Sequence, residues 1–182
     1  MLKTLFLLIC CAGVALLPPK RANARGSISS SPCISTGWPH DESDLPVDKS
    51  LIFGTLDNGL RYVLKHNGEP KNRVALYLNV QAGSLHESAE QRGLAHYLEH
   101  MLFNGSTHYP PGTLVQYFQS IGMGFGAETN AHISYDETVY KLVLPAADEK
   151  TLNDGIVVLT DYARGALLSE EEVERERGVI FA

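Results

Sequence analysis

The stretch that decides the fold is RGLAHYLEHMLFNGS, residues 92–106. It is apolar for most of its length, yet it carries His96, Glu99 and His100. Leucines at intervals of four predict a helix over about 91–103, because such residues share a helix face. These leucines are Leu94, Leu98 and Leu102. An imidazole or carboxylate buried in such a helix costs free energy unless it has a partner, so the pattern predicts a shared partner for the three polar groups.

A zinc ion is the partner that these three residue types favour. Residues four apart lie on one helix face, so His96 and His100 can direct two ring nitrogens to one point, with Glu99 beside them. In a hydrolytic zinc site the metal acidifies a water molecule and a carboxylate takes its proton. A bare H-x-x-E-H would favour ordinary helix histidines and a solvated glutamate. The apolar context favours the zinc site.

Strand signals precede this helix. The sequence LIFGTLDNGLRYVLKHN, residues 51–67, has two strand-like runs around Asp57, Asn58 and Gly59. This pattern predicts a hairpin, because Asn and Gly tolerate the backbone angles of a tight turn. The alternation of apolar residues in RVALYLNVQAG, residues 73–83, predicts a half-buried strand.

A second helix and two strands follow. The apolar spacing from Gly112 to Ile121 predicts a helix that Gly122 closes. Residues 124–133 are Gly-rich and polar, which is typical of an edge strand. The next run, up to residue 144, has Val139, Leu142 and Leu144 and is expected to be a core strand.

Two further helices are predicted, one from about Asp148 to Leu168 and one from about Ser169. Ser169 with Glu172 three residues later forms a capping box. The acidic first turn suits the helix dipole and is expected to be solvated; its members are Glu170, Glu171, Glu172 and Glu174. The chain stops at Ala182 within this helical pattern, so we expect an incomplete domain.

The first 24 residues, MLKTLFLLICCAGVALLPPKRANA, differ from the rest in composition. A basic start, an apolar run over 5–17 and small residues before position 25 predict a secretory signal peptide and a periplasmic or extracellular protein. The apolar run is shorter than the ~20 residues that cross a bilayer, which favours cleavage over the alternative of a membrane anchor. Residues 25–48, rich in Ser, Pro and Asp, are predicted to be a linker or surface arm.

Cleavage after Ala24 changes the charge and the cysteine content. It would leave 12 basic residues against 21 acidic ones, a formal net charge of −9. This balance argues against nucleic acid as the partner. Cys10 and Cys11 would leave with the signal peptide, so Cys33 alone could not form an internal disulfide.

Four sequence motifs, spread in a fixed order over about residues 50–182, surround and include the H-x-x-E-H motif. They are TLDNGLRYVL, AGSLHESAEQRGLAHYLEHMLFNGSTHYP, TNAHISYDETVY and EEVERERGVI. Together they resemble the N-terminal domain of the pitrilysin, insulinase and mitochondrial processing peptidase family, zinc metalloproteases with an inverted H-x-x-E-H motif. The resemblance implies an α+β fold, a mixed β-sheet with helices mainly on one face as in the LuxS/MPP-like metalloproteases. Residues 49–182 would form this peptidase domain, truncated at its C-terminus.

The resemblance also implies roles for individual residues. His96 and His100 would be ligands of one zinc ion, and Glu99 would be the general base. Asn130 and Ala131 would belong to the edge strand on which an extended substrate peptide is laid. Ordinary turn chemistry is the alternative for Asn130.

The third zinc ligand of the family is a glutamate about 75 residues beyond the second histidine. Counting leads to Glu176. Alignment of the E-R-E-R turn with that of the family leads instead to position 183, one residue beyond Ala182. Glu176 lies on the same helix face and would then contact a metal ligand without binding the metal itself. We favour this alignment over simple counting, because the segment before the helix can contain inserted residues, whereas the spacing within the helix is fixed.

The expected function is that of an exported zinc endopeptidase or oligopeptidase acting on extended peptides. Further domains or a partner subunit of the same family would close a chamber around the substrate, so the fragment alone is expected to be inactive. No nucleic acid and no stable membrane span after signal cleavage are expected. The alternatives are a non-catalytic structural or assembly subunit of the family, against which the intact motif argues, and a metal-binding module without hydrolysis.

Overall fold

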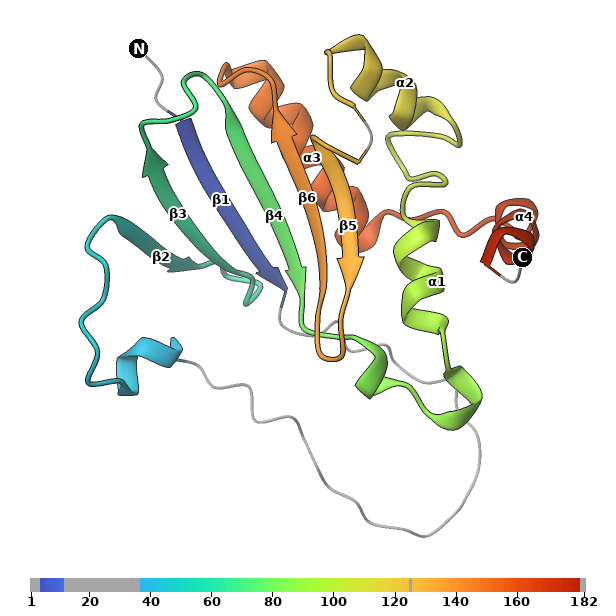
Figure 1. Ribbon diagram of the computed structural model, residues 1–182, viewed down its shortest axis with the longest axis horizontal. Coiled ribbons are helices and arrows are strands. Elements are labelled where there is room, and N and C mark those ends of the chain that lie inside the picture. The colour runs from blue at the N-terminus through green and yellow to red at the C-terminus, as the bar shows by residue number, and fades with distance from the viewer. Residues whose placement is uncertain (1–3, 12–36, 125, 181–182) are drawn as a thin grey trace, which may run out of the picture.

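The computed structural model describes residues 4–11, 37–124 and 126–180 and contains one six-stranded mixed sheet with the order β2-β3-β1-β4-β6-β5 (Figure 1). The strands are β1 (Thr4–Cys11), β2 (Leu51–Thr55), β3 (Arg61–Asn67), β4 (Val74–Val80), β5 (Thr129–Ile133) and β6 (Thr138–Leu144). The helices are α1 (Leu94–Met101), α2 (Thr113–Ser120), α3 (Glu149–Arg164) and α4 (Glu170–Ile180), with 3-10 turns η1 (Pro39–Glu42), η2 (Ser84–His86) and η3 (Ala89–Gln91). The expected α+β class is confirmed.

The predicted hairpin is formed by β2 and β3. These strands pair antiparallel, with Leu51 opposite Lys65 and Thr55 opposite Arg61. Gly59 has a φ of 84°, a left-handed conformation that favours glycine, and the side chain of Asn58 accepts a hydrogen bond from the backbone of Leu60. The Asn-Gly signal therefore marks the turn that sets the register of this pair.

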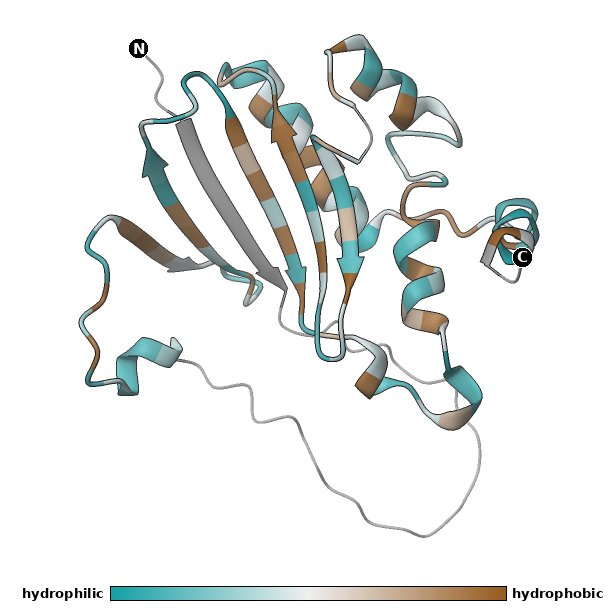
Figure 2. Ribbon diagram, in the orientation of Figure 1, coloured by the Kyte–Doolittle hydropathy of each residue, from teal (hydrophilic) through white to brown (hydrophobic). Residues whose placement is uncertain are grey.

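The core lies between the sheet and α3. Strands β4 and β6 are antiparallel neighbours, and their alternate residues Leu76, Leu78, Leu142 and Leu144 are almost fully buried. Figure 2 shows the resulting alternation of hydrophobic and hydrophilic positions along both strands. Helix α3 approaches them at Gly155, where an added Cβ would lie 2.8 Å from a methyl group of Leu76 and of Leu144. The sheet and α3 thus pack closely because this position has no side chain.

This close approach predicts that Gly155→Val destabilises the protein by about 1–3 kcal/mol, because the new methyl groups overpack the core. Gly178 is the matched control, since a Cβ added there meets no atom within 4 Å. Gly178→Ala should instead stabilise helix α4 by about 0.5–1 kcal/mol. Urea unfolding midpoints of both variants test the packing. A Gly155→Val protein as stable as the wild type would contradict the contact of α3 with the sheet.

Strand β5 forms one edge of the sheet, next to β6, and α1 lies beside it (Figure 1). The prediction of an edge strand followed by a core strand is therefore confirmed. Helix α1 also contacts α4 on its other side. The histidine-bearing helix is thus placed between the free edge of the sheet and α4.

The observed β1 lies inside the segment predicted to be a signal peptide. It runs antiparallel to β3 and parallel to β4, while residues 1–3 and 12–24 lie outside the described part of the chain. Signal cleavage would remove β1 and leave the facing edges of β3 and β4 without it. In the described ranges, no helix is both long and apolar enough to cross a membrane. The signal peptide stays a prediction.

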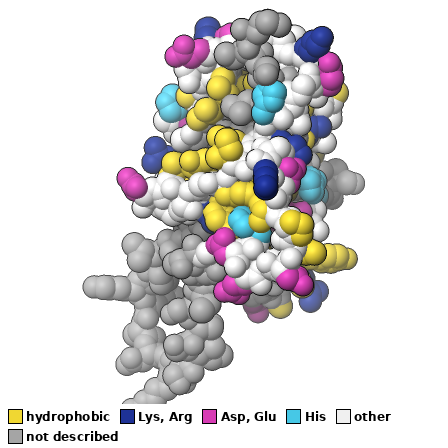
Figure 3. Space-filling view, turned by 90° about the vertical axis from the view of Figure 1, so that its left-hand side faces the viewer, with side chains coloured by type: hydrophobic (Ala, Val, Ile, Leu, Met, Phe, Trp, Pro, Cys, Tyr) yellow, Lys and Arg dark blue, Asp and Glu magenta, His cyan; other side chains and the backbone are white. Residues whose placement is uncertain are grey.

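The described end of the predicted arm, residues 37–48, is held on the β2–β3 hairpin. The rings of Trp38 and Phe53 meet edge to face at 4.9 Å, and the Arg61 guanidinium lies 5.1 Å from the Trp38 ring centroid. Such aromatic and cation–π contacts are each worth on the order of 1 kcal/mol. Figure 3 shows this side of the molecule, where hydrophobic side chains are exposed among charged ones.

Two details of the helix predictions are wrong. Leu94 and Leu98 are 53% and 44% exposed, and only Leu102 is buried, at 6%. Helix α1 contacts β5 and α4 through other residues, so the side that carries the leucines is covered only at its C-terminal end. Helix α3 ends at Arg164 and not near residue 168, because the chain after it pairs with the loop that follows α1.

Candidate metal centre

Helix α1 begins at a fixed point because an upstream carboxylate binds its first turn. Glu87 accepts hydrogen bonds from the backbone N–H of Ala95 at 2.7 Å and of Gly93 at 2.9 Å. These bonds lower the pKa of Glu87, with the Ala95 bond as the largest cause. Gly93 itself has a φ of 85°, which suits glycine. Two of the backbone amides that a helix start leaves unpaired thereby have an acceptor.

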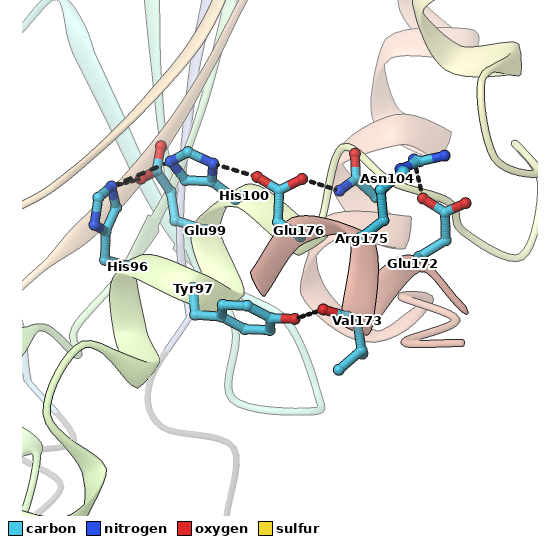
Figure 4. A network of polar contacts seen from close by, with 9 residues as sticks. All are labelled: His96, Tyr97, Glu99, His100, Asn104, Glu172, Val173, Arg175 and Glu176. Carbon is cyan, nitrogen blue, oxygen red and sulfur yellow. Dashed lines mark hydrogen bonds and ion pairs between the residues drawn. The ribbon is translucent and has the colours of Figure 1, made fainter. Parts of the chain in front are cut away.

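The structure brings together the three predicted side chains of α1 (Figure 4). Nε2 of His96 lies 3.1 Å from Nε2 of His100, and Glu99 Oε2 lies 3.9 Å from Nε2 of His96. One ligand atom from each residue falls within a group no more than 4.8 Å across. The His96 side chain is 51% exposed and the Glu99 side chain 12%. The expectation of a buried helix is therefore wrong, since the site lies at the surface with its carboxylate turned inward.

Glu176 of α4 sets the proton position on His100. Its Oε1 lies 2.7 Å from Nδ1 of His100. A carboxylate only accepts hydrogen bonds, so Nδ1 carries the proton and Nε2 of the neutral ring keeps its lone pair. That lone pair faces the corresponding nitrogen of His96. Two nitrogen ligands on a tetrahedral zinc ion are about 3.4 Å apart, so the observed pair fits a zinc ion with little movement.

Two residues that the sequence reasoning did not assign hold α4 against α1. The side-chain amide of Asn104 donates to Glu176 Oε2 at 2.8 Å, and the Tyr97 hydroxyl donates to the backbone carbonyl of Val173 (Figure 4). Asn104 lies four positions after His100, so helical spacing was the available signal for it. Glu176 is 9% exposed and is placed behind His100, on the side of the ring away from His96.

The predicted solvation of the acidic first turn of α4 is wrong for one residue. Glu172 is 5% exposed and pairs with Arg175 on the next turn of the helix. The other three members, Glu170, Glu171 and Glu174, are exposed as expected. Glu172 and Glu176 are four residues apart, so the two buried carboxylates lie on the same face of α4.

Tyr140 of β6 lies in the core near Glu99. Its ring packs against those of Tyr162 at 5.1 Å and Phe103 at 6.3 Å. Burial raises the pKa of Tyr140, and the negative charge of Glu99 raises it further. The Tyr140 hydroxyl therefore stays protonated, and it adds no negative charge beside Glu99.

The loop after α1 is fixed to α3 by Asp161. This buried carboxylate accepts bonds from the Ser106 hydroxyl at 2.6 Å, the His108 backbone N–H at 2.9 Å and the His108 ring at 2.8 Å. Burial alone would raise the pKa of Asp161, but the bonds from Ser106 and His108 together outweigh it and lower the pKa. Thr107 N–H also donates to the Gly165 carbonyl at 2.9 Å. The loop is thus tied to the segment that leads into α4.

Asn130 and Ala131 lie on β5, the edge strand that α1 contacts. Asn130 is exposed, and its side-chain carbonyl accepts a hydrogen bond from the Ala131 backbone N–H at 2.9 Å. A peptide that used this N–H would have to displace the Asn130 side chain. These two residues are outside the polar network of Figure 4.

The edge strand β5 lies beside a helix that carries two converging histidines and a carboxylate, and these residue types bind the catalytic zinc ion of metal-dependent hydrolases. The family model for insulinase, peptidase family M16, matches residues 62–182, and the chain belongs to this family. The probable zinc protease PqqL of Escherichia coli K12 is 42% identical over 136 residues. The β subunit of the mitochondrial processing peptidase of Rattus norvegicus is 36% identical over 126 residues, which cover 69% of this chain and 24% of that protein.

Solved structures of similar proteins agree with the fold. The crystal structure of the periplasmic protease PqqL from Escherichia coli matches with a TM-score of 0.72 over 75% of this chain, at 42% identity. That of pitrilysin matches with a TM-score of 0.57 over 76% of this chain, at 29% identity. The aligned part covers 15% of the PqqL chain and 14% of the pitrilysin chain, so this chain corresponds to a small part of those proteins.

Proposed function

We propose that this chain carries the metal-binding and general-base part of a zinc peptidase that hydrolyses extended peptides. One observation carries the proposal. Two histidine Nε2 atoms lie 3.1 Å apart and a carboxylate lies beside them, on a helix next to a free strand edge. His96 and His100 would hold the zinc ion through these nitrogens. Zinc bound there would supply a Lewis acid that lowers the pKa of a water molecule and polarises a carbonyl group.

Glu99 is the general base of the proposed reaction. Its carboxylate accepts a proton from the attacking water and gives it to the nitrogen of the leaving amine. The side chain is mostly shielded from solvent, and it lies within reach of both histidines. Shielding strengthens the interaction between the carboxylate and the charges that develop beside it.

The edge of β5 is the proposed substrate platform. An extended peptide can add to a free strand edge through main-chain hydrogen bonds. Asn130 and Ala131 would belong to this edge, and the Ala131 N–H would bond to the peptide after the Asn130 side chain turns away from it. The contact between α1 and β5 supports this assignment, because it holds the strand edge next to the helix that bears the metal ligands.

Glu176 is proposed to orient His100 and not to bind zinc. Its carboxylate is already engaged by His100 Nδ1 and by Asn104, on the far side of the ring. A carboxylate behind a metal-binding histidine fixes the ring and its tautomer. The third ligand is therefore proposed at position 183. A fragment that ends at residue 182 would bind zinc weakly and would have no peptidase activity.

We further propose that the protein is exported and that other domains or a partner subunit close the site. The signal-like start of the sequence supports export, and the E. coli relative of known structure is a periplasmic protease. Both relatives of known structure are about seven times longer than the aligned part of this chain, which leaves room for further domains.

The proposed function is tested by zinc binding and peptidase activity in a form that extends past residue 182. We expect His96→Ala to weaken zinc binding by more than about 100-fold, beyond the range typical of groups behind the ligands, and to abolish peptide cleavage. His66→Ala is the matched control, because His66 is an exposed histidine of β3. Zinc competition with a chelator and cleavage of a fluorogenic peptide are the measurements.

Three results would each contradict part of the proposal. Unchanged zinc affinity in His96→Ala would remove His96 from the site. Equal, tight zinc binding by the 182-residue chain and by the extended form would favour Glu176 as third ligand over position 183. A protein that binds zinc tightly at these histidines but cleaves no peptide in its extended form would instead be a metal-binding module.

A further inference from the structure

We propose that Asn104 is a positioning residue of the zinc site and acts through Glu176. This inference rests on the proposed function. The amide nitrogen of Asn104 lies 2.8 Å from Glu176 Oε2, and Glu176 Oε1 lies 2.7 Å from His100 Nδ1. The contacts form one chain, from amide to carboxylate to imidazole, that ends at the nitrogen facing His96 (Figure 4).

The Glu176 carboxylate requires a hydrogen-bond donor, and the Asn104 amide provides one. Glu176 is 9% exposed, so a carboxylate oxygen without a hydrogen bond would cost free energy there. With Oε2 bound to Asn104, Oε1 is directed to His100. A carboxylate that could turn freely would leave the His100 ring free to turn as well, and the two Nε2 atoms would no longer converge.

The backbone that carries Asn104 is anchored independently of this bond. Asn104 N–H donates to the carbonyl of Met101 at 3.0 Å. The carbonyl of the next residue, Gly105, accepts from Leu167 N–H at 3.1 Å in the linker between α3 and α4. The same linker leads to the helix that bears Glu176, so this backbone bond connects the two segments that carry Asn104 and Glu176.

Gly105 allows this arrangement. Its φ is 126°, and an added Cβ would lie 3.0 Å from ring carbons of Pro111. Only glycine adopts such a conformation without strain. The chain therefore turns sharply after Asn104, and the side chain of Asn104 remains directed at α4 while the backbone leaves toward α3.

A double-mutant cycle on the extended, zinc-binding form of the protein tests the inference. The four proteins are the wild type, Asn104→Ala, Glu176→Ala and the double variant, and the measurement is the zinc dissociation constant from chelator competition. We expect Asn104→Ala to weaken zinc binding about 10-fold, as is typical of groups behind a metal ligand. Because Asn104 acts through Glu176, the double variant should bind zinc as Glu176→Ala does.

Asn104→Asp separates hydrogen bonding from packing. Aspartate has nearly the same size, but it presents a second carboxylate to Glu176 where the amide donated a proton. We expect a larger loss of zinc affinity than in Asn104→Ala, with a lower kcat and little change in KM. Asn153→Ala, at an exposed asparagine of α3, is the control and should bind zinc as the wild type does.

The outcomes distinguish this inference from the proposed function. Zinc binding equal to the wild type in Asn104→Ala or Asn104→Asp would overturn the role of Asn104 and leave the site intact. Losses that multiply in the double variant would show that Asn104 does not act through Glu176. Absence of zinc binding in the wild type would overturn the proposed function itself. Circular dichroism of each variant ensures that a folding defect is recognised as such.

Discussion

Glu99→Gln is expected to lower kcat for peptide hydrolysis by on the order of 10³-fold, because a general base typically contributes 10²–10⁴-fold. The amide has the same size as the carboxylate but cannot take a proton from water. His96 and His100 remain, so zinc binding should stay within a few-fold of the wild type. The measurement is kcat with a fluorogenic peptide, together with the zinc content of the same sample, in the form of the protein that extends past residue 182.

Glu90→Gln provides the control, since Glu90 is an exposed glutamate of η3 that precedes the same helix. It should leave both kcat and zinc content unchanged. A Glu99→Gln enzyme with an unchanged rate would show that the general-base assignment is wrong. If zinc content fell together with activity, Glu99 would be a ligand, and the short distance of 3.9 Å to His96 Nε2 would have to be read as part of the coordination sphere.

The sequence could predict the histidine pair because the contact is local. Residues four apart share a helix face whatever the helix packs against. The distance of 3.1 Å between the Nε2 atoms of His96 and His100 follows from that spacing and from the ring orientation of His100. The hairpin at Gly59 and the edge position of β5 were predictable for the same reason, since turn chemistry and polarity act locally.

Periodicity did not reveal which face of α1 is covered. The same four-residue spacing that joins the histidines also aligns Leu94 and Leu98, and both are exposed. Spacing shows which residues share a face, but burial depends on the neighbours that the fold supplies. In this structure β5 and α4 are those neighbours, and the contact with α4 includes hydrogen bonds from Tyr97 and from Asn104 just after α1.

The contacts of α4 could not be predicted from local pattern. Glu176 is 76 residues from His100 and 72 from Asn104, and only the tertiary fold brings them together. Glu172 was expected to be solvated because an acidic first turn suits the helix dipole. It is buried because the face it shares with Glu176 faces the molecule. The family resemblance indicated the importance of Glu176, and the geometry supports its position behind His100.

Asp161→Ala is expected to destabilise the protein by about 3 kcal/mol, because the buried Ser106 hydroxyl and the His108 backbone N–H lose their acceptor. Asp154→Ala on the same helix is the matched control. Asp154 is partly exposed and accepts from Tyr117 and Lys150, so its removal should cost about 1 kcal/mol. Urea unfolding at pH 7 measures both values. Equal losses in the two variants would contradict the special role of Asp161.

The effect of Asp161 should depend on pH with a definite sign. Hydrogen bonds from Ser106 and His108 lower its pKa in the folded state despite burial, whereas an unfolded aspartate titrates near pH 4. The carboxylate therefore stabilises the fold above about pH 4, and this contribution is lost as the pH falls through the lower folded value. The stability difference between the wild type and Asp161→Asn should shrink as the pH falls from 5 toward 2. A difference that grew on acidification would show that Asp161 is protonated in the native state, and the loop that follows Asn104 would then need another anchor on α3.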